Sequence, residues 1–263
     1  MPTPLRDSAA TAQAGDRALE NNSELDVLVT CEHATNAIPL AWRGRFHSPE
    51  AQRALDSHRG WDPGAREIAK RLAKLVNAPV VKGKASRLLV DLNRSPDNTE
   101  RWSEFTRELN DGALDRIDAK FGAPFRLKQL NALTQAARKS ARLLQMSIHT
   151  FTPELNGEVR DVDIGVLFDP AREWEAEFAA QLMAAFERDF PELRVRANVP
   201  YPGVMDGSIT WLRGQTTGEQ FAGIELEVNQ ALVFNRAWRW RTLHKRIAQT
   251  MADTIRSART FSL

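Results

Sequence analysis

Cysteine is nearly absent from this 263-residue chain, which has only Cys31. No internal disulfide can form, and a reducing, cytoplasmic setting is the simplest interpretation. Long apolar runs are also missing, since none approaches the roughly 20 residues that a membrane-spanning helix needs. Residues 1–23 lack the apolar segment of a signal peptide. We expect them to form a mobile leader before a single domain at 24–263.

An excess of charge of one sign is missing as well. The chain has 36 basic and 34 acidic residues, which leaves a net charge of +2. This balance gives no strong electrostatic case for binding nucleic acid. The densest basic stretch, 236–246, contains two tryptophans, and a solvated helix face with tryptophan anchors is its simpler interpretation.

Short apolar, strand-like runs alternate with amphipathic helical patterns along the chain. Such alternation predicts a mainly parallel sheet with helices on both faces. In sheets of this kind the ligand site lies beyond the carboxyl ends of the strands. Strands are expected at 26–31, 79–82, 87–92, 146–149, 163–168, 193–199 and 224–228, and helices from Ser48 and over 62–76, 126–144, 173–190 and 237–258.

Two of the five histidines, His33 and His149, stand where strand-like runs end. Each one alone is more simply a loop histidine bonded to the backbone. Together they form a candidate metal pair, because a catalytic zinc commonly takes three protein ligands and leaves one position for water. The residues that could supply the third ligand are Glu32, His58 and Asp62.

The three candidates differ in what else they could do. Glu32 neighbours His33, and adjacent side chains diverge in extended chain. Asp62 stands at a predicted helix start, where its alternative role is an N-cap. His58 could support a ligand or contact a substrate.

Other polar residues suggest further parts of a catalytic site. Glu225 and Glu227 are two apart on a predicted strand and share one side, which is either a solvent-facing surface or the position of a general base. Arg87 and the pair Asn93–Arg94 suit carboxylate recognition, although a salt bridge with the nearby Asp91 is the alternative.

Two more side chains are candidates for this site. The only tyrosine, Tyr201, lies in a turn-rich segment that we expect to form a loop over the site and to contact substrate. Cys31 ends a buried strand, so a small buried hydrophobe is a commoner role for it than a nucleophile.

Several segments together resemble the N-formylglutamate amidohydrolase family. They occur in the family's order and cover nearly the whole chain from Asp26 to Phe234. The Asp-Leu-Asn-Arg stretch is also similar to aspartoacylase, a zinc enzyme that cleaves an N-acyl amino acid. The segments are 31–39 (CEHATNAIP), 58–64 (HRGWDPG), 86–94 (SRLLVDLNR), 147–149 (SIH), 163–169 (DIGVLFD), 198–203 (NVPYPG) and 224–230 (IELEVNQ).

The resemblance implies a fold and a site. Both families are similar in fold to the zinc carboxypeptidases, which implies an α/β three-layer sandwich with a mixed, centrally parallel sheet. The implied roles are zinc binding by His33 and His149, general base by Glu227, polarisation of the scissile carbonyl by Arg87, and substrate carboxylate binding by Asn93 and Arg94. The related pattern has a glutamate three residues after the first histidine, where this chain has Asn36. The remaining zinc ligand must therefore come from elsewhere, and Asp62 is preferred over Glu32.

The predicted function is a Zn²⁺-dependent amidohydrolase that cleaves the N-acyl bond of an acidic or related amino acid, as in N-formylglutamate. One alternative is another zinc amidase or peptidase that acts on peptide or cell-wall amide bonds. A second is a non-catalytic protein that binds small carboxylates and needs no metal.

Overall fold

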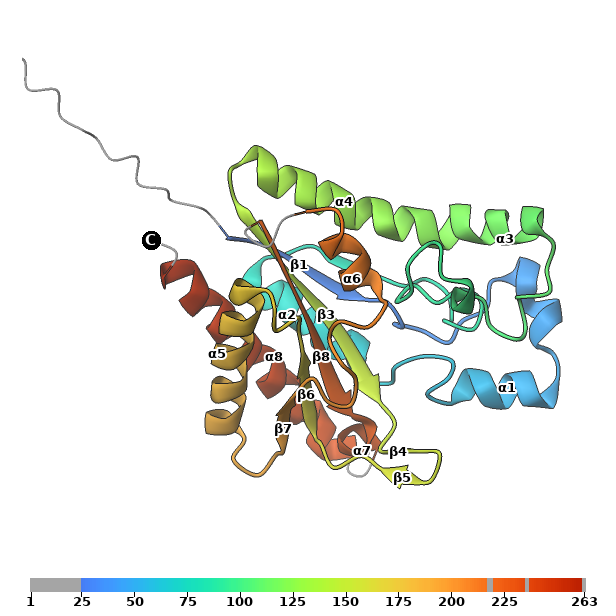
Figure 1. Ribbon diagram of the computed structural model, residues 1–263. Coiled ribbons are helices and arrows are strands. Elements are labelled where there is room, and N and C mark those ends of the chain that lie inside the picture. The colour runs from blue at the N-terminus through green and yellow to red at the C-terminus, as the bar shows by residue number, and fades with distance from the viewer. Residues whose placement is uncertain (1–24, 217–219, 235–236, 262–263) are drawn as a thin grey trace, which may run out of the picture.

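The computed structural model describes residues 25–216, 220–234 and 237–261, and a six-stranded sheet forms its centre (Figure 1). The predicted leader at 1–23 lies outside the described residues. The strand order is β2-β1-β3-β8-β6-β7. The strands are β1 (Leu25–Cys31), β2 (Val80–Lys82), β3 (Arg142–Phe151), β6 (Ile164–Leu167), β7 (Val195–Ala197) and β8 (Phe221–Asn229).

The sheet is mixed, with its parallel part in the centre. β2, β1, β3 and β8 pair in parallel, whereas β6 runs antiparallel to β8 and parallel to β7. A separate two-stranded hairpin of β4 (Glu154–Leu155) and β5 (Glu158–Val159) follows β3. The predicted mixed, centrally parallel sheet is therefore confirmed.

Helices cover both faces and complete a three-layer sandwich (Figure 1). α2 (Ala65–Val76), α5 (Glu173–Asp189) and α8 (Ala237–Phe261) pack on one face. α4 (Ala123–Arg138) and α6 (Ser208–Arg213) cover the other, with α1 (Pro49–Asp56) in the same core. The remaining elements are short: Leu40–Phe46 and Thr99–Arg101 (3₁₀), α3 (Asp111–Ile117), the π-helical turn Asp118–Gly122 and α7 (Gln230–Phe234).

The two faces of the central strands differ in polarity. On the face toward α2 and α8, side chains such as Cys31, Ile148 and Leu226 belong to one buried apolar cluster. On the other face the amino-terminal half is apolar, and Leu28, Leu143 and Phe221 pack there in the cluster that α4 and α6 share. Since side chains alternate along a strand, the carboxyl-terminal half of this second face carries Ser147, His149, Glu225 and Glu227.

The strand predicted at 87–92 is wrong, because this segment is a loop with turns. The Ser86 hydroxyl group donates to the carbonyl of Gly60, and the Leu89 amide donates to Ser86 rather than to a neighbouring strand. Its apolar side chains are buried in the α4-side core. Burial explains the apolar run, which by itself does not distinguish a strand from a packed loop.

The helix predicted over 126–144 is also too long. α4 ends at Arg138, and β3 already begins at Arg142. Between them Ser140 has a φ of 56°, and the Ala141 amide donates to the Ala136 carbonyl. A residue in the left-handed conformation commonly ends a helix but is usually glycine, so a serine at this position is no clear stop signal.

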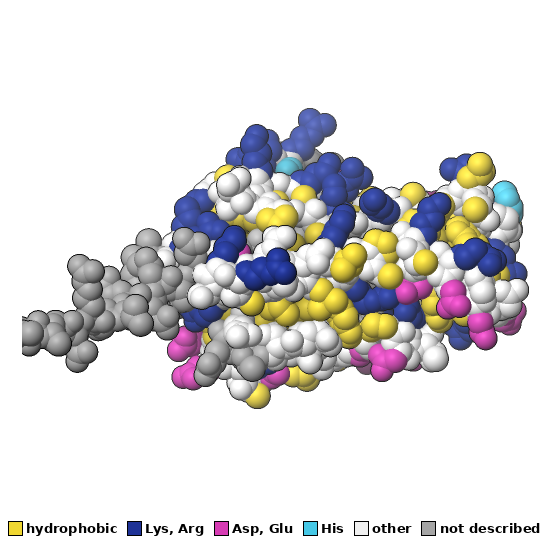
Figure 2. All heavy atoms as spheres, turned by 90° about the horizontal axis from the view of Figure 1, so that it is seen from above, with side chains coloured by type: hydrophobic (Ala, Val, Ile, Leu, Met, Phe, Trp, Pro, Cys, Tyr) yellow, Lys and Arg dark blue, Asp and Glu magenta, His cyan; other side chains and the backbone are white. Residues whose placement is uncertain are grey.

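The surface over α4 carries no single block of one charge. Figure 2 looks down on this face and shows Lys and Arg side chains spread along the molecule between neutral and hydrophobic ones. Among the described helices, none is both long and apolar enough to cross a bilayer.

Candidate active site

Parallel strand register brings the polar side chains together at one edge of the sheet. Thr30 pairs with Ser147 and His149 pairs with Glu227. His33 follows β1 by two residues. His149 lies within β3, which continues to Phe151 instead of ending at the histidine as predicted. The backbone thus sets both histidines and a glutamate side by side without any contribution from a long loop.

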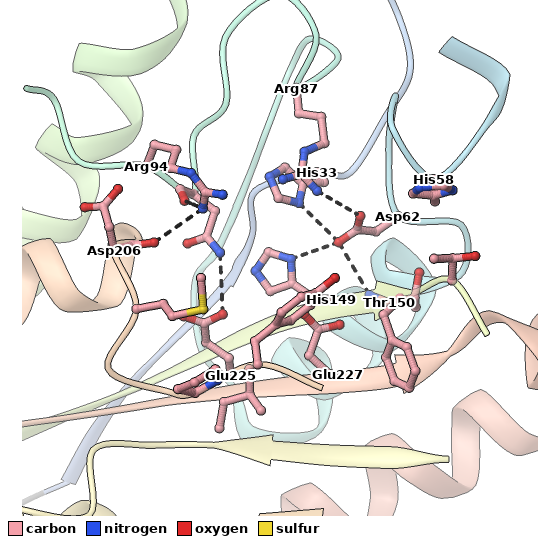
Figure 3. A pocket seen from close by; sticks show the side chains of 17 residues that line it. His33, His58, Asp62, Arg87, Arg94, His149, Thr150, Asp206, Glu225 and Glu227 are labelled. Atoms are coloured by element: carbon pink, nitrogen blue, oxygen red, sulfur yellow. Dashed lines mark hydrogen bonds and ion pairs between the residues drawn. The ribbon is translucent and has the colours of Figure 1, made fainter. Parts of the chain in front are cut away.

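His33, Asp62 and His149 form one buried group (Figure 3). The Oδ2 atom of Asp62 lies 3.2 Å from Nδ1 of His33 and 2.8 Å from Nδ1 of His149. The two ring centroids are 4.9 Å apart, and one ligand atom from each of the three residues lies within 4.8 Å of the others. A single cation could therefore contact all three side chains.

Each histidine has a second carboxylate behind its other ring nitrogen. Nε2 of His33 lies 2.7 Å from Oδ1 of Asp91. Nε2 of His149 lies 3.3 Å from Oε2 of Glu32 and 3.0 Å from the Ser147 hydroxyl oxygen. Because carboxylates only accept hydrogen bonds, each Nε2 atom is expected to carry a proton. Both Nδ1 atoms face the Asp62 carboxylate, so a hydrogen bond from either of them to Asp62 requires a proton on Nδ1 as well.

This arrangement explains the charge states around His149. Burial lowers the pKa of its imidazole, but hydrogen bonds and charge from Asp62 and Glu32 outweigh burial and raise the pKa well above the usual value. Burial also opposes ionisation of Asp62, yet the two histidines hold the pKa of that carboxyl far below its ordinary range. In the metal-free protein, a proton thus occupies the position that a cation would take.

Asp62 does not cap the following helix, as its alternative interpretation required. The N-cap of α2 is Gly64, at a φ of 91°, and no side chain caps it. A Cβ at Gly64 would come within 2.7 Å of the Trp240 ring, so α8 packs directly against this turn. The Asp62 carboxylate instead faces the histidines and accepts a hydrogen bond from the Thr150 amide at 3.4 Å.

Glu32 lies on the far side of the His149 ring from Asp62. Its two oxygens accept hydrogen bonds from the hydroxyl groups of Ser147 and Ser208, each at 2.6 Å. Burial raises the pKa of Glu32, but hydrogen bonds from His149, Ser147 and Ser208 outweigh it and hold the pKa at about 2. Both oxygens of this carboxylate are thus already engaged.

Glu225 and Glu227 do not form a solvent-facing strand surface, because both line a cavity beside the histidines. Burial raises the pKa of Glu227 to about 8; the charges of Asp62 and Glu225 add to this, and His149 opposes it. One oxygen of Glu227, Oε2, is buried without a hydrogen-bond partner. A carboxyl group in this state is ready to exchange a proton with a molecule in the cavity.

The predicted carboxylate-binding residues reach the same cavity with different partners. Arg87 donates to Oδ2 of Asp91 from Nη2 at 2.7 Å and from Nε at 3.2 Å, so the salt bridge weighed from the sequence is present. Its Nη1 atom lies 3.9 Å from the Asp62 carboxylate. Arg94 donates from Nη1 to the carbonyl oxygens of Asn93 and Asp206.

Asn93 is held by its own side chain. Its Oδ1 atom accepts from the Ser208 amide at 2.9 Å, and its Nδ2 donates to Glu225 at 3.4 Å. This bond from Ser208 leaves little space at Gly207, where an added Cβ would lie 2.9 Å from the same oxygen.

The cavity has a volume of about 160 Å³. Most of the residues considered from the sequence line it, whereas Glu32 and Cys31 do not: the lining includes His33, His58, Asp62, Arg87, Asn93, Arg94, His149, Tyr201, Glu225 and Glu227. Figure 3 shows Arg94 and Asp206 on one side of the histidines and His58 on the other. The loop that carries Tyr201 also supplies Pro202, Met205 and Asp206 to the lining, as expected of a segment over the site.

Sequence reasoning missed several supporting residues. Ser147 stands two residues before His149, and this spacing on a strand could have assigned it to the same side. Asp91 was considered only as a partner of Arg87, although it lies in the same distinctive segment. Ser208 and Asp206 are distant in sequence from both histidines, and no local pattern marks them. Cys31 is fully buried on the opposite face of the sheet, where burial raises the pKa of its thiol, which argues against a nucleophile.

The fold is a three-layer α/β sandwich whose sheet carries a buried His–Asp–His group at its carboxyl edge. The model of the N-formylglutamate amidohydrolase family matches residues 25–234. The chain therefore belongs to the N-formylglutamate amidohydrolase family, and this membership supports an amidohydrolase activity.

Solved structures agree on the fold. A gene product of Agrobacterium tumefaciens has a TM-score of 0.73 and 23% sequence identity, with 91% of this chain and 94% of that chain covered. The N-formylglutamate amidohydrolase of Ralstonia eutropha JMP134 has a TM-score of 0.69 and 14% identity, with 90% and 96% covered. Identities this low show the fold alone. No curated protein matched the sequence.

Proposed function

We propose that the protein is a metal-dependent amidohydrolase that cleaves the N-acyl bond of an acidic or related amino acid, as in N-formylglutamate. One observation carries the proposal: two imidazole Nδ1 atoms and the Asp62 carboxylate converge on a small buried volume. Two neutral imidazoles and a carboxylate, buried this close together, are unfavourable unless a positive charge lies between them. That charge is either a proton on a histidine or a metal ion.

The proposed metal ligands are His33, Asp62 and His149. Two histidines and a carboxylate are a common protein set for catalytic zinc. Asp91 and Glu32 would then orient the two rings from behind, as second carboxylates commonly do at zinc sites. When bound, such a cation lowers the pKa of water to about 7 and polarises the acyl carbonyl.

Glu227 is proposed to move the protons. It takes a proton from the attacking water and returns it to the amine nitrogen of the leaving amino acid. Its neighbour across the ladder is His149, so the carboxyl group lies next to the proposed metal site. A cation there favours the ionised form of Glu227, which brings its pKa from about 8 towards the neutral range in which a base works.

The remaining residues are proposed to bind and orient the substrate. Nη1 of Arg87 stabilises the negative charge that develops on the acyl oxygen. Asn93 and Arg94 bind a substrate carboxylate, which matches the amide and guanidinium donors on that side of the cavity. His58 and Tyr201 contact the substrate from the opposite wall. A cytoplasmic location is part of the proposal and rests on the single cysteine.

The direct test is a substrate panel with the metal removed and restored. The purified protein is treated with a chelator and reloaded with Zn²⁺, and hydrolysis of N-formyl and N-acetyl amino acids is compared with hydrolysis of short peptides. We expect activity on N-acyl amino acids that is lost with the metal and recovered with it. Cleavage of peptides alone would favour a peptidase. Carboxylate binding that survives chelation, without any hydrolysis, would favour a non-catalytic binding protein.

A further inference from the structure

Arg160 follows the β4–β5 hairpin next to the active-site cavity, and neither its position nor its charge is used by the proposed mechanism. The hairpin fixes its backbone, since its amide donates to the Pro153 carbonyl and its own carbonyl accepts from Val162, both at 2.9 Å. The backbone of Arg160 is therefore held in place by hydrogen bonds, and its side chain is half-buried.

The guanidinium group of Arg160 contacts the aromatic wall of the cavity. Its central carbon lies 4.9 Å from the centre of the Tyr201 ring and 5.7 Å from that of Phe151. Both rings line the active-site cavity. Stacking of this kind uses the flat face of the guanidinium group and leaves its N–H bonds free in the plane.

Those N–H bonds lack an anionic partner within the part of the chain that the structure describes. Nη1 of Arg160 is buried and donates to no acceptor among the described residues. The adjacent acid, Asp161, is paired with Arg194 instead. A desolvated nitrogen without an acceptor is costly, and one carboxylate could satisfy it.

The position of Arg160 is on the His58 side of the site. Burial lowers the pKa of His58, and the positive charges of Arg87 and then Arg160 lower it further. The guanidinium group of Arg160 is therefore close enough to His58, which lines the cavity, to repel its protonated form. Arg160 reaches the active-site cavity only through the Tyr201 and Phe151 rings, and it lines a separate cavity of about 360 Å³ together with Val199 and Pro200, which directly precede Tyr201 in the chain. Arg94 is on the other side of the histidines (Figure 3).

We propose that Arg160 is a specificity-determining residue that binds a second carboxylate of the substrate. The proposal rests on the function proposed above and adds a selection step. Arg94 and Asn93 bind one carboxylate of the leaving amino acid, and Arg160 binds the other carboxylate of the same amino acid from the His58 side of the cavity. The cavity then prefers N-acyl derivatives of dicarboxylic amino acids over otherwise identical neutral ones. The N–H groups of a guanidinium group bind a carboxylate more strongly than a neutral amide, because the hydrogen bonds to a carboxylate are charge-assisted.

The test compares two substrates of nearly equal shape, N-formylglutamate and N-formylglutamine. We expect Arg160→Met to lower kcat/KM for N-formylglutamate by roughly 10- to 100-fold, mainly through KM, because a charge-assisted hydrogen bond is lost. The value for N-formylglutamine should change little. Arg160→Lys keeps the cation and should retain part of the preference. Arg59→Met is the matched control, since Arg59 is exposed and paired with Glu104.

Equal losses on both substrates would overturn the proposal and make Arg160 a structural support for Tyr201. A second measurement separates this proposal from the function on which it rests. Binding of glutarate and of butyrate to the purified protein is measured by calorimetry. Weaker glutarate binding in Arg160→Met, with unchanged butyrate binding, supports Arg160 even if neither formyl compound is hydrolysed. Unchanged glutarate binding overturns it even if both are hydrolysed.

Discussion

The two histidines of the candidate site have similar partners but different surroundings. His149 lies within a central strand, and the carboxylate behind it, Glu32, is fully enclosed between two serine hydroxyl groups. His33 lies just beyond a strand, and the carboxylate behind it, Asp91, belongs to a loop and also binds Arg87. Burial opposes ionisation of Asp91, but Arg87 and His33 hold its pKa well below the ordinary value.

The difference suggests a division of labour. On the His149 side, Glu32 contacts the His149 ring and the hydroxyl groups of Ser147 and Ser208, none of which is proposed to touch the substrate, so its main expected effect is on metal affinity. On the His33 side, Asp91 joins a proposed metal ligand to Arg87, the residue proposed to stabilise the acyl oxygen. A change there should affect metal binding and catalysis together.

Removal of either histidine should abolish metal binding. We expect His33→Ala and His149→Ala each to reduce the bound Zn²⁺ from about one ion per chain to nearly none, because two remaining ligands hold zinc weakly. His47→Ala, at an exposed histidine, serves as the control. Metal analysis after dialysis measures the result. Full occupancy in either variant would remove that histidine from the proposed ligand set.

Loss of the proposed base should reduce turnover while metal binding persists. Glu227→Gln is expected to lower kcat by about 10²- to 10⁴-fold, the usual contribution of general acid–base catalysis. Glu187→Gln, at an exposed position of α5, is the matched control. Steady-state kinetics on zinc-loaded protein provide the measurement. Normal turnover in Glu227→Gln would shift attention to Glu225.

The two supporting carboxylates should differ in what they change. Glu32→Gln and Asp91→Asn are each expected to weaken zinc affinity by roughly 10- to 100-fold. When zinc is saturating, Glu32→Gln should recover nearly full kcat, whereas Asp91→Asn should stay impaired because Arg87 loses its anchor. Competition with a chelator gives the affinity, and kinetics at high zinc give the second comparison. Equal recovery of both variants would contradict the division of labour.

In the metal-free protein, the raised pKa of Glu227 should make the free energy of unfolding depend on pH. The folded-state pKa of about 8 lies above the ordinary 4.5, so the unfolded chain loses this proton first as the pH rises. Stability linked to this group is therefore fully present below pH 4.5 and lost progressively up to about pH 8. Relative to wild type, Glu227→Gln should gain on the order of 1 to 3 kcal/mol over this range. Denaturant unfolding at several pH values measures the gain, and a pH-independent difference would contradict it.

Much of the fold could be predicted from the sequence because it follows local patterns. Strands such as 224–228 and the amphipathic helix before Val76 are recognisable from periodicity alone. The segment 87–92 could not be assigned correctly, since its apolar side chains pack in a loop whose hydrogen bonds come from distant residues such as Arg101. Ser140 gave no stop signal because a non-glycine residue adopts the left-handed conformation there.

The candidate site divides in the same way. His33 and His149 are marked in the sequence by the ends of short apolar runs, although β3 continues past His149, and Glu227 is marked by the family resemblance and not by its spacing from Glu225. The partners that orient them are not marked, because Ser208 reaches Glu32 across 176 residues. The two candidate carboxylates, Glu32 and Asp62, could not be separated by sequence geometry, since the ring nitrogen that each one faces is decided only in the folded chain.

The most direct test of the account is a crystal structure of zinc-loaded protein with anomalous diffraction measured at the zinc edge. We expect one peak per chain, within bonding distance of Nδ1 of His33, Nδ1 of His149 and the Asp62 carboxylate, with Glu32 and Asp91 hydrogen-bonded to the Nε2 atoms. A zinc ion bound through Glu32 in place of Asp62, or no peak between the two histidines in fully loaded protein, would contradict it.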